Sequence, residues 1–446
     1  VAVDDDPTKL NQTIHGVPVK GTLEDIPDLC KRYGIHSIII AIPTLKGSKL
    51  NHVIDLCVST HCAVQLLSDP QLVGSGTPQQ GAFRELNPAD FLSRDEVTLD
   101  TDQISGYLTG KTVLVTGGGG SIGSELCRQV MRFKPGKLLI FDIYENCAYE
   151  LLMELQQKYG RDIPVTVLIG SIRDKKRLDE VFETYHPTVV FHAAAHKHVP
   201  LMEVSPAEAV KNNVLGTKNL LVSASEHDVE RFVQLSTDKA VNPTSVMGCT
   251  KRICEMLIQT FAGNTDMKCV AVRFGNVLGS HGSVIPLFEA QIKKGGPVTL
   301  TDPNIERYFM TIPEAAQLVL QAGALAESGN IYVLDMGEPV KIMDLAKQLI
   351  RFYGYEPGVN MEIKIVGLRP GEKLYEELMM DEEQDKMRRT QHNKIFVASP
   401  RSIDLAEFYG QLQELAAAAE HNDEGVVQQL AKMIPTFTPT RQNLKL

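Results

Sequence analysis

The sequence of 446 residues lacks several features that mark particular classes of protein. No apolar run approaches the ~20 residues that a membrane-spanning helix needs, and the longest, residues 37–43, has the length of a strand. Basic residues form no block, and Asp and Glu outnumber Lys and Arg by 55 to 45, which argues against a nucleic-acid partner. The eight cysteines include no Cys-x-x-Cys pair, which indicates reduced, buried thiols in a cytoplasmic protein.

The beginning of the chain also lacks a signal peptide. It opens on Val1 and runs from a strand-like start into an acidic turn, VDDDP. We therefore expect a soluble fragment whose N-terminal portion is missing. The length exceeds that of one ordinary domain, so we expect several domains.

Short apolar segments alternate with amphipathic ones along most of the chain, which predicts an α/β fold. From residue 111 on, six continuous apolar strands alternate with helices, and this rhythm indicates a doubly wound parallel sheet. We expect the following organisation: a partial N-terminal α/β domain in 1–85, a connector in 86–110, the parallel-sheet domain in 111–278, and a smaller substrate-binding domain with a helical tail in 279–446. Part of 300–335 is expected to return to the parallel sheet.

A glycine-rich loop, TGGGGSIGSEL, follows the first strand of the parallel-sheet domain. Gly117, Gly120 and Gly123 fit the spacing G-x-x-G-x-x-G, whereas Gly118 in place of Gly117 gives G-x-G-x-x-G. Either register lets the backbone approach a pyrophosphate at the start of the next helix. Asp142 ends the next strand, where a carboxylate binds an adenosine ribose and favours NAD over NADP. These features predict a Rossmann domain that binds NAD.

The third and fourth strands end in small or polar residues at the edge of the sheet where such folds bind ligands. The residues that we expect to bind the cofactor are Gly117, Gly120, Ser121, Ile122, Gly123, Asp142, Ser171, Ile172, Ala193, Ala194, Asn213 and Lys251.

The fifth strand ends in Ser-Thr-Asp-Lys at residues 236–239, and Met247 and Lys251 follow at the i, i+4 spacing of one helical face. This pattern resembles the extended short-chain dehydrogenase/reductase family over about residues 111–380. In that family a Tyr-x-x-x-Lys pair follows a strand end that carries Ser or Thr. Met247 stands at the tyrosine position, and a thioether cannot exchange a proton. Another group must therefore handle protons.

Three further motifs, HAAAHKHVP at 192–200, RFGNV at 273–277 and RPGEK at 369–373, extend the resemblance. Together with Ser-Thr-Asp-Lys they resemble the membrane-associated branch of UDP-N-acetylglucosamine 4,6-dehydratases, which carries methionine in place of the tyrosine. The resemblance implies a homo-oligomer. It also implies that a missing N-terminal segment anchors the full-length protein at the cytoplasmic face of a bacterial inner membrane.

The chemistry that this resemblance implies is oxidation of the sugar at C4, loss of water across C5–C6 and reduction at C6, for surface polysaccharide synthesis. We expect Lys239 to be the base, with its pKa lowered by Lys251 and the nicotinamide charge. We expect Asp238 to be the acid, kept protonated by burial. Thr237, and in second place Ser236, would bind the C4 hydroxyl, while Lys251 would hold the nicotinamide ribose.

Four residues are candidates for binding the UDP-sugar substrate. Lys197 and Arg369 carry charges that suit a diphosphate, and Asn276 supplies a neutral donor. Glu372 belongs to the same RPGEK motif. For Arg369 a solvated surface charge is an equally good interpretation.

Three histidines, His192, His196 and His198, lie close together in the sequence. Their short spacing on a loop without a neighbouring cysteine or carboxylate does not fit a metal site, so no metal is predicted.

Two other functions remain open. A nucleotide-sugar 4-epimerase or reductase would need a tyrosine at position 247, where the chain has methionine. A non-catalytic NAD-sensing protein would need no Asp238–Lys239 pair, and in such a protein Met247 would be an ordinary core residue.

Overall fold

The computed structural model describes residues 1–42, 45, 48–67, 83–87, 90, 97–398, 403–422 and 425–439. The chain forms two compact units. The first comprises Val1–Glu96, Gly282–Asn304 and Val340–Val366, and the second comprises Val97–His281, Ile305–Pro339 and Gly367–Leu446.

The first unit is a small α/β assembly. Its strands are β1 (Ala2–Val3), β2 (Thr13–Ile14), β3 (Val17–Gly21), β4 (Ser37–Ile40), β5 (Ala63–Leu67), β6 (Phe83–Glu85), β14 (Val298–Leu300), β18 (Val340–Lys341) and β19 (Ile363–Ile365). Its helices are η1 (Leu23–Asp25), α1 (Ile26–Tyr33), α2 (Ser48–Val58), α11 (Val284–Lys293) and α13 (Ile342–Phe352). Strands β4 and β5 are parallel and β6 joins them antiparallel. The helices and strands expected between residues 23 and 67 are confirmed, whereas the Gly- and Pro-containing stretch around residues 74–78 lies outside the described residues.

The second unit is built on a nine-stranded sheet in the order β20-β21-β17-β12-β11-β10-β7-β8-β9. Its strands are β7 (Thr112–Thr116), β8 (Lys137–Asp142), β9 (Val165–Ile169), β10 (Val189–His192), β11 (Arg231–Thr237), β12 (Lys268–Phe274), β17 (Ile331–Leu334), β20 (Arg388–Arg389) and β21 (Ile395–Ala398). Strands β7 to β12 and β17 are parallel, and β21 and β20 pair antiparallel. Two short strands, β13 (Asn276–Val277) and β16 (Phe309–Met310), pair separately, and β15 (Glu306–Arg307) lies just before β16. All six strands predicted from residue 111 onward are present.

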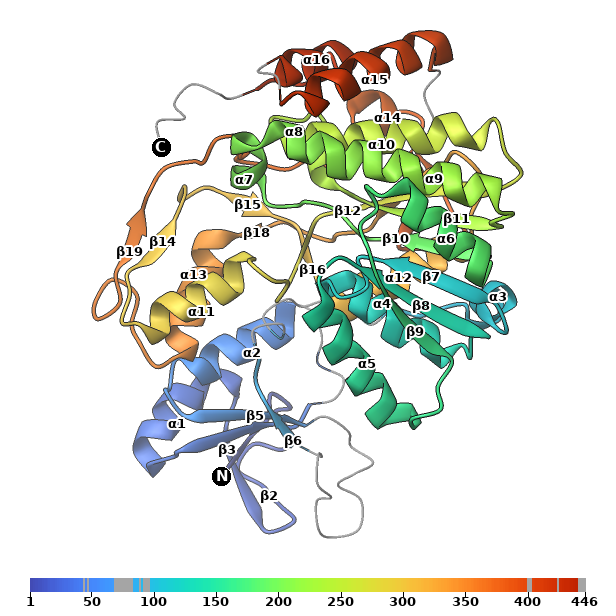
Figure 1. The fold of residues 1–446 in the computed structure, drawn as a ribbon. Helices are drawn as coiled ribbons and strands as arrows, with labels where there is room; N and C mark the ends of the chain where they lie inside the picture. Colours follow the sequence, from blue (N-terminus) through green and yellow to red (C-terminus); the bar gives the residue numbers. More distant parts are fainter. Residues whose placement is uncertain are drawn as a thin grey trace. The chain divides into compact units, whose positions relative to one another are not determined.

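Helices cover both faces of this sheet (Figure 1), which confirms the doubly wound Rossmann architecture. One face packs against α3 (Thr101–Leu108), α4 (Ser121–Arg132), α5 (Glu145–Tyr159) and α12 (Ile312–Ala324). The other face packs against α6 (Lys175–Tyr185), α7 (Val199–Val204), α8 (Pro206–Ala209), η4 (Val210–Leu215), α9 (Gly216–Glu226), α10 (Val246–Ala262), α15 (Leu405–Glu420) and α16 (Val426–Met433). The remaining elements are η5 (Asp238–Ala240) and α14 (Asp381–Gln384).

The C-terminal part of the chain is divided differently from the expected domain in 279–446. Strand β17 and the antiparallel β21 extend the Rossmann sheet, and α15 and α16 contribute Phe408, Leu412 and Leu430 to its core. Residues 305–339 and 367–446 therefore belong to the second unit, whereas residues 282–304 and 340–366 belong to the first. The expected return of part of 300–335 to the sheet is seen in β17.

A buried cluster of four charges lies behind the end of β11. Arg273 donates to Glu255 at 2.7 and 3.0 Å and to Glu383 at 2.8 Å, and Arg252 donates to Glu255 at 2.8 Å. Burial would raise the pKa of Glu255, but Arg273, Arg252 and the hydroxyl of Ser236 lower that pKa to about 2. The cluster ties α10, β12 and α14 together through paired charges.

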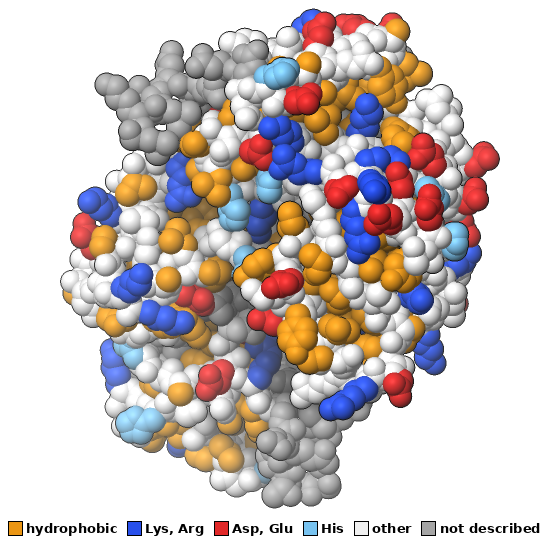
Figure 2. All heavy atoms as spheres, in the orientation of Figure 1, with side chains coloured by type: hydrophobic (Ala, Val, Ile, Leu, Met, Phe, Trp, Pro, Cys, Tyr) orange, Lys and Arg blue, Asp and Glu red, His pale blue; other side chains and the backbone are white. Residues whose placement is uncertain are grey.

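The surface over α6 and α9 carries both signs of charge close together, as Figure 2 shows at the upper right. Lys175 pairs with Asp179 and Glu226, and Arg173 pairs with Glu208. Neither sign of charge therefore forms a continuous patch over these two helices. Across the part of the chain that the structure describes, no helix combines the length and apolar character needed to cross a membrane.

Candidate active site

The glycine-rich loop connects β7 to α4 and makes the tight turn that the sequence predicts. Gly117 has a φ of +67°, and a Cβ atom there would lie 2.6 Å from the backbone nitrogen of Ala194. A Cβ at Gly123 would overlap the carbonyl oxygen of Gly117. Side chains are therefore excluded at both positions, and Gly117 is the first glycine of the motif.

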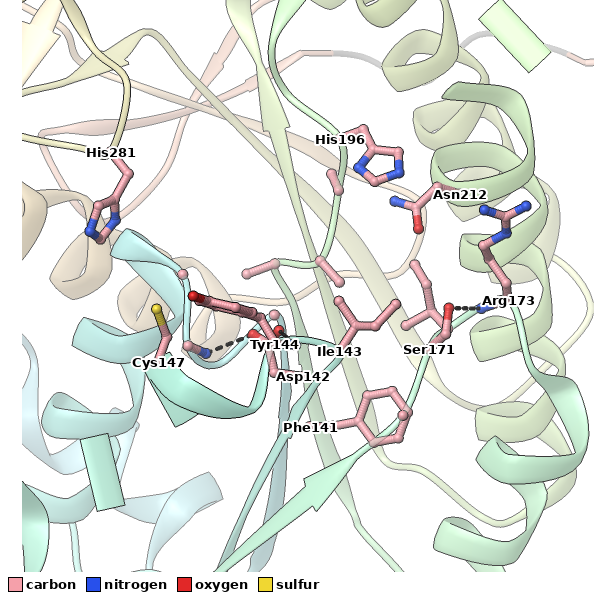
Figure 3. Close-up of a pocket in the computed structure, with 18 residues that line it drawn as sticks. Phe141, Asp142, Ile143, Tyr144, Cys147, Ser171, Arg173, His196, Asn212 and His281 are labelled. Atoms are coloured by element: carbon pink, nitrogen blue, oxygen red, sulfur yellow. Dashed lines mark hydrogen bonds between the residues drawn. The ribbon is translucent and has the colours of Figure 1, made fainter. Parts of the chain in front are cut away.

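A cavity of about 450 Å³ opens beside this loop, at the carboxyl ends of β7, β8, β9 and β10. Figure 3 shows Cys147 and His281 at one end of the cavity and Asn212 and Arg173 at the other. Among the predicted cofactor residues, those that line the cavity are Gly117, Gly120, Asp142, Ser171, Ile172, Ala193 and Ala194. The site therefore brings together loops that are far apart in the sequence, as expected at this edge of a Rossmann sheet.

The carboxylate of Asp142 is fixed by two backbone amides. It accepts hydrogen bonds from Gly119 at 2.8 Å and from Tyr144 at 2.9 Å. These bonds hold the carboxylate at the end of β8, inside the cavity (Figure 3).

Five predicted cofactor residues do not line this cavity: Ser121, Ile122, Gly123, Asn213 and Lys251. Asn213 is buried and instead holds the loop after β10, by accepting from the His196 amide and donating to the His196 carbonyl and the Thr250 hydroxyl. Its neighbour Asn212 lines the cavity. Both asparagines lie in the π-helical turn η4, and no sequence signal distinguished one from the other.

Asp238 and Lys239 form a short turn, η5, directly after β11. The ammonium of Lys239 donates to Asp238 Oδ1 at 2.9 Å and to Asn276 Oδ1 at 3.1 Å. Thr237 donates to the same Asp238 oxygen at 2.9 Å. Asp238 is fully buried, and its Oδ2 has no hydrogen-bond partner among the residues that the structure describes. Three of the predicted catalytic residues and Asn276 are therefore in direct contact.

The expected lowering of the Lys239 pKa is wrong. Burial lowers this pKa, but the carboxylates of Asp238 and Glu376 outweigh burial and raise it above its ordinary value. Lys251 is not among the groups that shift the pKa of Lys239, and its Nζ donates to the Leu235 carbonyl at 2.6 Å. Burial lowers the pKa of Lys251 itself.

Glu376 is a member of the cluster that the sequence did not reveal. Its Oε1 lies 3.5 Å from Lys239 Nζ, and its side chain is 2% exposed. Glu376 follows the RPGEK motif by three residues, so the motif located its segment without singling out this side chain.

Residues 113–400 match a family described as "Polysaccharide biosynthesis protein". The chain belongs to this family. The match confirms the resemblance to polysaccharide biosynthesis proteins of the extended short-chain dehydrogenase/reductase type.

Individual relatives agree with this family. The capsular polysaccharide biosynthesis protein CapD of Staphylococcus aureus is 53% identical over 85% of this chain. The matched part spans only 63% of the length of CapD. A UDP-N-acetylglucosamine 4,6-dehydratase (inverting) of Campylobacter jejuni is 34% identical over 60% of this chain and 76% of its own. The X-ray structure of Pen from Bacillus thuringiensis, 34% identical, matches with a TM-score of 0.61 over 66% of this chain and 90% of that one.

Within this family member, the methionine at the tyrosine position is a core residue. Met247 is 4% exposed and packs in the hydrophobic core, one helical turn before Lys251 on α10.

Ser236 faces the opposite side of β11 from Thr237, because neighbouring residues of a strand alternate between its two faces. Its hydroxyl donates to Glu255 at 2.7 Å. The second-place role of Ser236 at the C4 hydroxyl is therefore not supported.

The three histidines have separate environments. His192 is buried between the hydroxyls of Thr116 and Thr217, at 2.7 and 2.9 Å. Burial and then the charge of Lys251 lower the pKa of His192 to about 3, so its ring is neutral. His196 and His198 are exposed. Within the described ranges, no three His, Cys, Asp or Glu side chains are grouped to hold a metal ion.

The predicted substrate residues are only partly brought together. Asn276 contacts Lys239, as described above, and Glu372 lies 3.6 Å from Arg307. The side chains of Lys197 and Arg369 are exposed. Their role at a diphosphate remains a prediction.

Proposed function

We propose that this chain is an NAD-dependent nucleotide-sugar 4,6-dehydratase that acts on UDP-N-acetylglucosamine. The observation that carries the proposal is the contact between Asp238, Lys239, Thr237 and Asn276 at the end of β11. The dehydration needs an acid and a base close together, and this cluster supplies both without a tyrosine. The named activity of the Campylobacter relative supports the choice of substrate.

The residues around the cavity fit NAD. The loop with Gly117 leaves room for a pyrophosphate at the start of α4, and Asp142 presents a carboxylate where an adenosine ribose binds. Bound NAD supplies the oxidising and reducing equivalents for C4 and C6 of the sugar. We propose that Lys251 binds its nicotinamide ribose.

The chain's own residues would carry the remaining steps. Thr237 binds the C4 hydroxyl and, through its hydrogen bond to Asp238 Oδ1, passes the hydroxyl proton to the Asp238 carboxylate as C4 becomes a ketone. Once C4 is a ketone, the neutral amine of Lys239 removes the proton from C5. Asp238 protonates the C6 hydroxyl, and the C6–O bond breaks to release water. After C6 is reduced, Lys239, whose ammonium exchanges protons with solvent, returns a proton to C5.

The test is incubation with UDP-N-acetylglucosamine and catalytic NAD⁺ in deuterated water, followed by NMR and mass spectrometry. A 4-keto-6-deoxy sugar with deuterium at C5, formed without net NADH, is the expected product. An epimer that keeps its C6 hydroxyl would support the epimerase alternative instead. NAD binding without any change in a panel of nucleotide sugars would support the non-catalytic alternative.

Two variants test the residue roles. Lys239→Ala and Asp238→Asn should each retain NAD binding and lose turnover by about 10²-fold or more, the scale of acid–base contributions. Lys176→Ala, at an exposed lysine on α6, is the matched control. Full activity in both variants would contradict the assigned roles.

A further inference from the structure

The roles proposed above leave one buried carboxylate unused. Glu376 lies 3.5 Å from Lys239 Nζ and 3.8 Å from Arg307 Nε through its Oε1, and its Oε2 has no hydrogen-bond partner within the described residues. A carboxylate buried this deeply is costly unless it is paired and hydrogen-bonded. Glu376 therefore needs an explanation beyond packing.

Backbone contacts hold the segment that carries Glu376. The guanidinium of Arg307 donates to the carbonyls of Lys373 at 2.7 Å and of Leu374 at 3.1 Å. Lys373 donates to the Val241 carbonyl at 2.9 Å. None of these bonds uses the Glu376 carboxylate. A glutamine at position 376 should therefore keep its place.

The surroundings of Lys239 fit an ammonium at rest. Its Nζ faces three oxygens, from Asp238 and Asn276 at hydrogen-bond distance and from Glu376 at 3.5 Å. An ammonium has three donors and no lone pair. Lys239 must lose one proton before it can remove another from the sugar.

We propose that Glu376 receives the proton that Lys239 must release before it acts as the base, so that Glu376 works through Lys239. The inference rests on the proposed dehydratase function. In this step an N–H bond of Lys239 breaks and an O–H bond forms on Glu376. Both charges disappear together, and no external acid or base takes part. The neutral pair has none of the desolvation cost of the buried ions.

Glu376 suits this role better than Asp238. Asp238 Oδ1 already accepts hydrogen bonds from both Thr237 and Lys239, and Asp238 has the separate role of the proposed acid. Among the described residues, no hydrogen bond fixes the Glu376 carboxylate in the same way. Burial, and then the charge of Asp238, raises the pKa of Glu376, although Lys239, Arg307 and Lys373 oppose the rise.

The pH dependence of turnover tests this step. In the wild type the Glu376–Lys239 pair keeps one proton over a broad range, so the neutral-amine fraction is constant there. In Glu376→Gln the proton must leave to solvent. Turnover of the variant relative to wild type should then be at least about tenfold lower at pH 7 and should rise with pH, by up to about tenfold per pH unit, until the Lys239 amine is neutral.

Two further variants separate charge from structure. Glu376→Asp keeps a carboxylate, so its turnover relative to wild type should depend less on pH than that of Glu376→Gln. Glu377→Gln, at a neighbouring side chain that is 47% exposed, should match the wild type at every pH. A Glu376→Gln ratio that is constant at all pH values, whether near one or uniformly low, would overturn the inference.

A readout without turnover separates this inference from the proposed function. Competitive labelling with acetic anhydride across pH, read by mass spectrometry, gives the titration midpoint of the Lys239 amine. Removal of the anion in Glu376→Gln should lower that midpoint by about one pH unit or more. An unchanged midpoint would refute the Glu376–Lys239 pairing. If the wild type forms no keto sugar, the proposed dehydratase function is refuted, whereas the Glu376–Lys239 pairing is judged by the midpoint.

Discussion

Replacement of Arg273 by methionine should destabilise the second unit in a pH-dependent way. Arg273 is fully buried between Glu255 and Glu383, so methionine keeps much of the apolar volume but leaves the two carboxylates with Arg252 as their one cationic partner among the described residues. Breaking a buried pair from one side costs about 3–5 kcal/mol. The folded-state pKa of Glu255, about 2 against an ordinary 4.5, gives a similar figure of about 3 kcal/mol.

The sign of the pH effect follows from the lowered pKa of Glu255. The stability that this depressed pKa contributes is fully present above about pH 4.5 and is lost as the pH falls toward 2. In Arg273→Met the carboxylates can become neutral by protonation as the pH falls. The loss of unfolding free energy relative to wild type should therefore be largest near pH 7 and smaller at pH 4.

Thermal unfolding followed by far-UV circular dichroism is the suitable assay, because the chain has no tryptophan for fluorescence. At pH 7 the transition of the second unit should fall by roughly 6 °C or more. Arg161→Met, at an exposed arginine, is the control. An equal drop in melting temperature at pH 4 and pH 7 would mean that Arg273→Met destabilises the unit through packing rather than charge. An unchanged melting temperature would refute the stabilising role of the charge cluster.

Three other changes probe the site. Gly248→Ala places a Cβ against the Lys239 carbonyl, so it should reduce turnover by about tenfold or more. The control, Gly410→Ala, has open space around the new Cβ and should preserve turnover and slightly raise the melting temperature. Equal turnover in the two variants would contradict the role of Gly248 in placing Lys239. Asp142→Ser should weaken NAD binding by about tenfold and narrow the preference over NADP, as measured by calorimetry. Met247→Tyr should give little or no gain in turnover, because position 247 is packed in the core, and a large gain would indicate the tyrosine route.

The parts of the fold that depend on local pattern could be predicted from the sequence. Continuous apolar strands and the glycine-rich loop located β7 to β12 and the cavity at their carboxyl ends. Asp238 and Lys239 directly follow β11, so the sequence also predicted their position at the carboxyl edge of the sheet. Domain limits could not be predicted so well, because β21 and the two last helices join the sheet and its core from far along the chain.

The electrostatics of the site could not be predicted, because they depend on contacts between distant segments. Lys239 was expected to respond to Lys251, which is near in sequence, but it responds to Glu376, which a later segment delivers. The opposite orientations of Ser236 and Thr237 could have been anticipated from strand alternation. The choice of Asn212 over Asn213 at the cavity required the geometry of η4.

The two outermost strands of the nine-stranded sheet differ in their resistance to aggregation. Strand β20 consists of two exposed arginines, Arg388 and Arg389, and a short, charged strand is a poor template for another chain. Strand β9, VTVLI at Val165–Ile169, is longer and carries no charge. Strand addition during refolding or concentration should therefore begin at β9, and a lysine introduced at Thr166 is the substitution that would discourage it.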